Sequence, residues 1–102
     1  MKREEVAEYN EEALLCDGFD DAIIGVAQRI NLCVAAYDVE KIIDILKPDM
    51  PLDDEELKLS VEEQDSRRYE MALEHFNFNI IGSWVGENTP VFIYKSYYDD
   101  DI

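Results

Sequence analysis

The chain has 102 residues, among them 25 acidic and nine basic side chains, and its formal net charge is −16 at pH 7. Hydrophobic residues make up 47% of the sequence, more than a disordered acidic chain carries, so we expect a folded protein. We predict one small acidic α+β domain over residues 1–94 and a frayed acidic tail over 95–102.

Two short apolar runs define the N-terminal half of the chain. They follow a weakly amphipathic segment at 3–14, which predicts a short helix, and occupy positions 22–27 and 32–37. The short polar link between the two runs predicts a β-hairpin. Gly25 lies inside the first run, which indicates a β-bulge or a close approach of another backbone segment.

Two helices are predicted in the second half of the chain. Asp38 is a favourable N-cap for the first of them, which Pro48 ends because proline cannot continue a helix. An acidic excursion, residues 48–68, leads into the second helix, and Ser60 and Glu63 within it match the capping box that opens a helix.

A last strand at 91–94 completes the order (α)ββααβ. We expect an α+β fold in which two helices pack on one face of a small three-stranded antiparallel sheet, because this arrangement buries the apolar stripes of both helices. The predicted core consists of Ile23, Val26, Val34, Ile42, Ile43, Leu46, Leu73, Phe76, Trp84 and Phe92.

Three stretches of the chain carry distinctive motifs. They are ALLCDGFDDAIIGVAQR, VAAYDVEKIIDIL and YEMALEHFNFNIIGSWVGENTPVFI, and the last contains the signature F-x-F-N-x-x-G-x-[WY]-V-G-E-x-T-P-[IV]-F. Over residues 13–47 and 69–93 the chain resembles a family of small uncharacterised proteins from bacteriophages and prophages. The resemblance implies a phage origin and no assigned activity. That family has a short link where this chain has the acidic excursion 48–68, which is therefore an addition particular to this protein.

No catalytic residue, metal site or cofactor is predicted. Asp17, Asp20 and Asp21 offer oxygen ligands of the kind that Mg²⁺ and Ca²⁺ prefer, but their spacing is typical of a turn and does not match an EF-hand loop. His75 is the only histidine and has Glu70 and Glu74 near it in the sequence, but acid–base catalysis also needs a pocket, and a lone histidine on a helix is more often structural or solvated.

The composition also bears on the compartment. No apolar run is long enough to span a membrane, and the first residues lack the apolar stretch of a secretory signal, so we expect the cytoplasm, that of the host cell if the chain is phage-encoded. Cys16 and Cys33 lie in apolar surroundings, which indicates two reduced core cysteines, with a disulfide or a metal pair as the alternative.

A secondary candidate site is the loop at 82–90. It combines two glycines with Trp84, Glu87 and Asn88, which suits a small binding site. The alternative is a simple turn at the exit of the second helix, in which Trp84 fills the core.

The primary candidate site is acidic. Its residues are Asp53, Asp54, Glu55, Glu56, Glu62, Glu63 and Asp65. A continuous helix here would carry about one net charge per ~3.3 Å, close to the ~3.4 Å phosphate spacing along one DNA strand, although Pro51 and the Ser60 cap interrupt such a helix. The segment is either a solvated face or a surface for a basic partner, and its charge disfavours direct binding of nucleic acid.

We hypothesise a small, acidic, non-enzymatic interaction protein that inhibits a host nucleic-acid-binding enzyme or defence nuclease, of the anti-CRISPR or anti-restriction type. Its partner is a basic host protein whose groove normally holds nucleic acid, and the chain acts as a monomer or a homodimer, without a membrane or a cofactor. One alternative is a small-molecule- or metal-binding module that uses the Asp17–Asp21 and Trp84–Glu87 loops. The other is a virion assembly protein.

Overall fold

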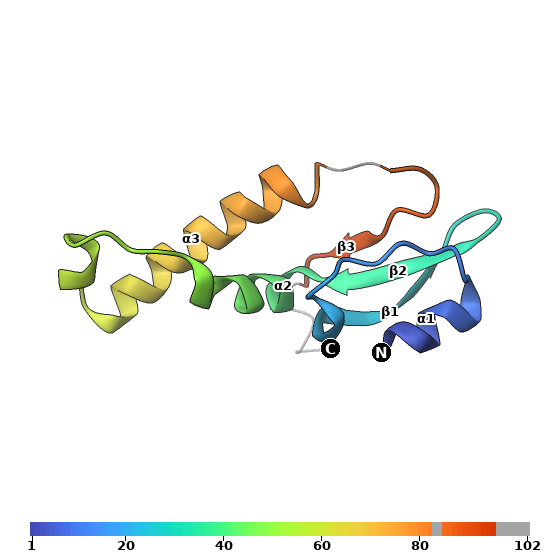
Figure 1. Cartoon of the computed structure of the whole chain (residues 1–102), viewed down its shortest axis with the longest axis horizontal. Helices are drawn as coiled ribbons and strands as arrows, with labels where there is room; N and C mark the ends of the chain where they lie inside the picture. The colour runs from blue at the N-terminus through green and yellow to red at the C-terminus, as the bar shows by residue number, and fades with distance from the viewer. Residues whose placement is uncertain (83–84, 96–102) are drawn as a thin grey trace. The chain divides into compact units, whose positions relative to one another are not determined.

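The structure is a computed structural model of the chain, and it describes residues 1–82 and 85–95. These residues form three α-helices, short 3₁₀ turns and one three-stranded sheet, in the order αββααβ (Figure 1). The α+β class is therefore as predicted. Backbone contacts divide them into two compact units, residues 1–42 with 85–95 and residues 43–82. None of the helices in the described ranges has the length and apolar character needed to cross a membrane.

The sheet of the first unit is mixed rather than antiparallel. Strands β1 (Ile23–Gln28) and β2 (Cys33–Asp38) form the predicted antiparallel hairpin, and β3 (Val91–Ile93) pairs with the other edge of β2 in parallel. The predicted all-antiparallel sheet is thus wrong for this pair. The chain leaves β2 into a helix and returns only after a long connection, and such a crossover permits a parallel strand.

The bulge predicted at Gly25 is confirmed. Ile23 pairs with Tyr37, but Gly25 already pairs with Ala36, so β1 contains one residue more than β2 over this step. A Cβ atom on Gly25 would meet no other atom within 4 Å, so a close backbone approach does not account for the glycine.

Helix α1 (Arg3–Tyr9) is shorter than the predicted segment. It contacts β1 and β2, and Val6 is its buried residue. The helix ends because Asn10 adopts an extended backbone conformation. The Asn10 side chain then accepts a hydrogen bond from the Glu12 amide, which is a local alternative to further helix.

Asp38 caps α2 (Val39–Leu46) as predicted. Its Oδ1 atom accepts a hydrogen bond from the Glu40 amide at 3.0 Å, and its Oδ2 atom lies 3.2 Å from Lys95 Nζ. The carboxylate is almost completely buried, so the lysine compensates a charge that water does not reach. The helix ends at the 3₁₀ turn η2 (Lys47–Asp49), which contains the proline predicted to stop it.

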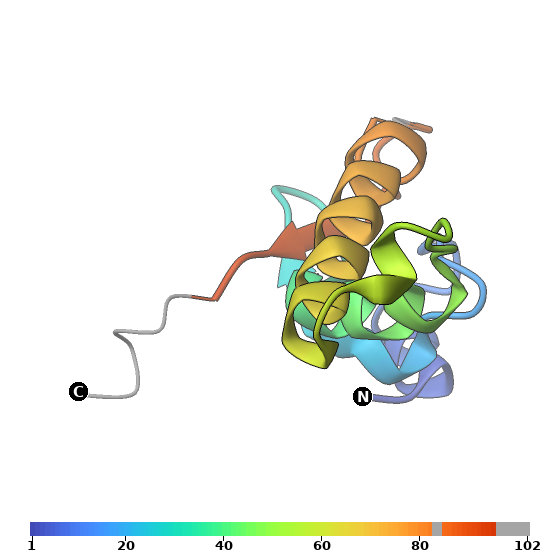
Figure 2. The same ribbon diagram turned by 90° about the vertical axis from the view of Figure 1, so that its left-hand side faces the viewer.

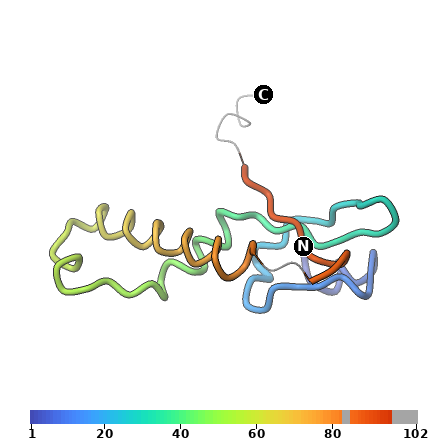
Figure 3. The backbone as a smooth tube through the Cα atoms, turned by 90° about the horizontal axis from the view of Figure 1, so that it is seen from above, coloured from blue at the N-terminus to red at the C-terminus, as the bar shows by residue number. Residues whose placement is uncertain are grey.

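The second unit comprises the end of α2 from Ile43, the turn η2, a second 3₁₀ turn η3 (Glu56–Lys58) and the long helix α3 (Val61–Asn79). The segment that carries the two turns runs beside α3 in the opposite direction (Figure 2 and Figure 3). Ser60 is the N-cap of α3, as predicted, and accepts a hydrogen bond from the Glu63 amide at 3.2 Å.

Most of the predicted core is buried. Six residues of the list are confirmed, namely Ile23, Val34, Ile42, Ile43, Leu46 and Phe76. Val26, Leu73 and Phe92 are half-buried, and Trp84 and the tail 96–102 lie outside the described residues. The buried hydrophobic residues of the described ranges that the list omitted are Val6, Ala22, Ala35, Ala36, Tyr37, Val39 and Ala72. The single domain and the two helices on one face of the sheet stay predictions, because α3 belongs to the second unit.

Candidate interaction surface

The acidic segment, residues 53–65, begins with a reciprocal pair of hydrogen bonds. The Glu56 amide donates to Asp53 Oδ1 at 2.8 Å, and the Asp53 amide donates to Glu56 Oε1 at 3.2 Å. This capping box builds η3 from two of the seven candidate acids. Sequence reasoning missed it, although the D-x-x-E spacing signals such a box.

Basic side chains pair with three of the seven acids. Glu56 Oε2 accepts a hydrogen bond from Arg67 Nε at 2.7 Å, and this bond holds the pKa of the Glu56 carboxyl below its usual range. Asp65 lies 2.9 Å from Lys47 Nζ, and Glu55 lies 3.2 Å from the ammonium of a lysine one turn later. The Glu56 and Asp65 pairs join the segment to α3 and to η2, whereas the Glu55 pair lies within the segment.

Hydrogen bonds at the start of α3 also hold the acidic segment in place. The Ser60 hydroxyl donates to Glu63 Oε1 at 3.1 Å, so the carboxylate reaches the hydroxyl of the cap rather than the backbone amide expected from a capping box. The Gln64 side chain donates to the carbonyls of Leu57 and Leu59 at 3.1 and 2.9 Å. The turn before the helix is therefore bound to the first turns of the helix.

Two candidate acids have no such structural role. Asp54 and Glu62 are exposed, and neither forms a hydrogen bond or ion pair with a described residue. Leu57 and Val61 are also exposed, by 51% and 83%. Glu62, Glu63 and Arg67 line a shallow groove of about 360 Å³ over the first turns of α3. The surface thus combines free carboxylates with apolar side chains, and the sequence pattern had not indicated the latter.

The secondary candidate loop divides into structural and exposed residues. The Asn88 side-chain oxygen accepts a hydrogen bond from Asn10 at 2.9 Å, and its backbone carbonyl accepts one from the Leu14 amide at 3.1 Å. The buried Thr89 hydroxyl donates to the Gly86 carbonyl at 2.6 Å and closes the turn. These contacts hold the loop against the N-terminal segment, so Asn88 serves the fold.

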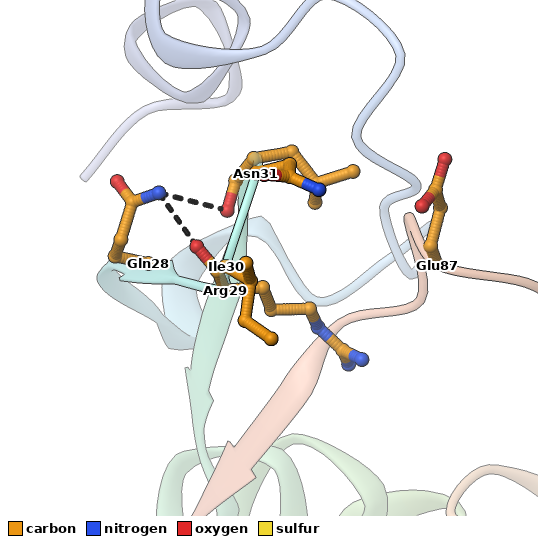
Figure 4. A pocket seen from close by; sticks show the side chains of 6 residues that line it. Gln28, Arg29, Ile30, Asn31 and Glu87 are labelled. Carbon is orange, nitrogen blue, oxygen red and sulfur yellow. Dashed lines mark hydrogen bonds between the residues drawn. The ribbon is translucent and has the colours of Figure 1, made fainter.

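Glu87 is exposed, as are Gly82 and Val85 among the described residues of that loop. With the tip of the β1–β2 hairpin, Glu87 lines an open pocket of about 540 Å³. Figure 4 shows the Glu87 carboxylate extending away from the Arg29 guanidinium, while Gln28 bonds to carbonyls of the hairpin turn. Trp84, the other candidate of this loop, lies outside the described residues.

Two of the three aspartates at 17–21, Asp17 and Asp20, face an arginine. Arg3 donates to both carboxylate oxygens of Asp20, at 2.7 and 2.8 Å, and lies 3.5 Å from Asp17. The hydrogen bonds from Arg3 hold the pKa of Asp20 below its usual range. A bidentate guanidinium thus takes the place of the cation that this cluster of acids would attract.

The remaining chemical candidates are placed in the fold. Burial raises the pKa of the Cys16 thiol, which disfavours a nucleophilic thiolate. The Cys33 thiol donates to the Gln28 side chain at 3.2 Å, and both cysteines are free thiols. His75 is exposed on α3 beside Asn79. Within residues 1–82 and 85–95, no group of three or more histidine, cysteine or acidic side chains is arranged to hold a metal ion.

Comparison with protein-family models, with curated proteins and with solved structures finds no match for this chain. No activity is therefore carried over from a relative.

Proposed function

We propose that this chain is a small phage-encoded interaction protein that inhibits a host nucleic-acid-binding enzyme, such as a restriction or CRISPR-type nuclease. The acidic segment is the contact surface, and its carboxylates enter the basic groove that holds nucleic acid in the partner. One observation carries the proposal: the segment is ordered by its own hydrogen bonds, while Asp54 and Glu62 remain exposed and unpaired among the described residues. The phage origin rests on the sequence resemblance.

The acidic segment is held in one conformation before it meets a partner, and this favours binding. Asp54 and Glu62 lie on a backbone that a capping box and a helix cap hold in place, and such a backbone loses less conformational freedom on association than a loose tail does. Residues 43–82 carry eleven acidic and four basic side chains, a net charge of −7. A field of this sign accelerates the encounter with a basic channel.

The exposed apolar side chains favour a protein as the partner. Leu57 and Val61 lie among the acids, and protein interfaces combine an apolar centre with a polar rim. Acids in the first turn of α3 also stabilise that helix through its dipole, which accounts for Glu62 in a solvated face. The dipole does not account for the exposed Leu57 or for Asp54, which precedes the helix.

The test removes the two unpaired charges. Asp54→Asn combined with Glu62→Gln deletes two carboxylates without breaking a hydrogen bond of the described residues. The matched control is Glu4→Gln combined with Glu8→Gln, the same charge change on exposed positions of α1. The purified chain and both double variants are added to DNA-cleavage assays of a panel of bacterial restriction and CRISPR nucleases, at low and at near-physiological salt.

The parent chain and the α1 control should slow cleavage by at least one nuclease. The double variant of the acidic segment should associate with that nuclease several-fold more slowly at low salt and show a flatter salt dependence, since peripheral charges act mainly on the association rate. If no nuclease is inhibited, or if both double variants match the parent at every salt concentration, the acids are only a solvated face and the proposal is wrong.

A further inference from the structure

Helix α3 carries a second apolar stripe besides the one that faces the core. Ala72 and Phe76 belong to the core stripe and are fully buried. Met71, His75 and Phe78 follow one another at spacings of four and three residues, so they share another face of the helix. Phe78 is 77% exposed there, which is unusual for a phenylalanine on a rigid helix.

Met50, at the end of η2, supplies the opposite wall of a groove along this face. The groove is open, has a volume of about 300 Å³ and is lined by Met50, Met71, Glu74, His75, Phe78 and Asn79, all within the second unit. The wall is fixed, because Arg68 donates to the Met50 carbonyl at 3.4 Å and Lys47 pairs with Asp65 at 2.9 Å. The groove is thus part of the fold of this unit.

We propose that this groove binds an amphipathic helix of a partner protein, one that carries apolar side chains on one face and lysines or arginines beside them. The inference does not depend on the proposed function of the acidic segment. Two methionines and a phenylalanine form a surface that adapts to apolar side chains, because methionine is flexible and polarisable. An amphipathic helix in such a groove is a recurring mode of protein recognition.

Charge complementarity selects a basic helix. Glu74 lines the groove and forms no ion pair with a described residue, and Asp49 is exposed beside Met50. The net charge of −7 on residues 43–82 repels nucleic acid and anionic lipid surfaces. The same negative charge also repels the acidic unit of a second copy of this chain. A cationic helix with an apolar face complements both the apolar lining of the groove and the acidic side chains beside it.

The dimensions agree with a short contact. Met71 and Phe78 are seven residues apart, which corresponds to about 10 Å along the helix axis. A volume of about 300 Å³ is at the lower limit of ligand pockets and accommodates one or two large side chains. The partner helix therefore needs two apolar side chains one or two turns apart, with basic residues next to them.

The test uses three fluorescein-labelled synthetic helices with the full-length chain. The first carries leucine on one face and lysine elsewhere, the second has serine in place of leucine, and the third has glutamate in place of lysine. Fluorescence anisotropy is measured with the parent, with Phe78→Ser and with Tyr9→Ser. Tyr9 is 60% exposed on α1, outside both the groove and the acidic segment, so its variant is the matched control for the loss of one exposed aromatic side chain.

The leucine–lysine helix should bind the parent and the Tyr9→Ser chain at least ten-fold more tightly than either of the other two helices does. Phe78→Ser should lose at least ten-fold in affinity for the leucine–lysine helix. The inference would be overturned if the parent bound the serine–lysine helix as tightly as the leucine–lysine helix. It would also be overturned if Phe78→Ser bound the leucine–lysine helix as tightly as the parent does. Sedimentation of the parent as a dimer that Phe78→Ser dissociates would overturn it as well, because the groove would then hold a second copy.

Discussion

Tyr37 joins two segments of the first unit through a single side chain. Its hydroxyl accepts a hydrogen bond from the Cys16 amide at 2.7 Å, and its ring stacks on Phe92 with the centroids 5.9 Å apart. The side chain is completely buried in the central strand of the sheet. The sequence placed Tyr37 in a strand but not in the core, because its amide partner 21 residues away leaves no local pattern.

Tyr37 should make the protein sensitive to alkaline pH. Burial raises the pKa of Tyr37 from 10.0 to about 12. Below pH 10 the phenol is protonated in both states, and between pH 10 and 12 the unfolded chain releases the proton first. The free energy of unfolding should therefore fall over this interval, by up to about 2–3 kcal/mol. Urea denaturation over a series of pH values measures the effect.

Two variants isolate this effect from the titration of other groups. Tyr37→Phe should lose about 1–3 kcal/mol near neutral pH, because the Cys16 amide loses its acceptor, but should show a shallower alkaline fall. Tyr9→Phe, on an exposed position of α1, should keep the parent's slope. A parallel alkaline loss in the parent and in Tyr37→Phe would assign the pH dependence to other residues.

Among the elements, those with local signals were predictable from the sequence. Asp38 and Ser60 each cap a helix whose first turn follows directly in the chain, so cap and helix appear together in the sequence. The hairpin and the Gly25 bulge are local as well. The direction of β3 is not, because it depends on the path of the chain between β2 and β3 rather than on any residue of the strand.

Helix α3 offers a test of its core face by two phenylalanines of opposite exposure. Phe76 is fully buried and Phe78 is 77% exposed, two residues further along the helix. Phe76→Ala should lower the free energy of unfolding by ~3–5 kcal/mol, whereas Phe78→Ala should stay within about 0.5 kcal/mol of the parent. Chemical denaturation of both variants decides, and a loss below ~1 kcal/mol for Phe76→Ala would mean that the buried face of α3 is wrongly assigned.

For the whole molecule, the sequence predicted the charge but not how it is arranged. The pairs Arg3–Asp20, Glu56–Arg67 and Asp38–Lys95 join residues 11 to 57 positions apart, and no spacing rule connects such residues. Among the candidate acids, local spacing signals only the two capping patterns, the predicted one at Ser60 and Glu63 and the missed one at Asp53 and Glu56. The exposed apolar residues around the acids have no signal in the sequence, because exposure depends on the packing of the segment against α3.

The balance between repulsion and these pairs sets the salt dependence of stability. Salt shortens the Debye length from ~30 Å at 0.01 M to ~8 Å at 0.15 M, which screens the long-range repulsion of 16 net negative charges. The paired charges lie only 2.7–3.2 Å apart, well inside either Debye length, so salt weakens their attraction less than it weakens the long-range repulsion. The free energy of unfolding in urea, an uncharged denaturant, should therefore rise with sodium chloride. Glu4→Lys combined with Glu8→Lys reduces the net negative charge and should show a smaller rise. A fall with salt in the parent would mean that the ion pairs outweigh the repulsion.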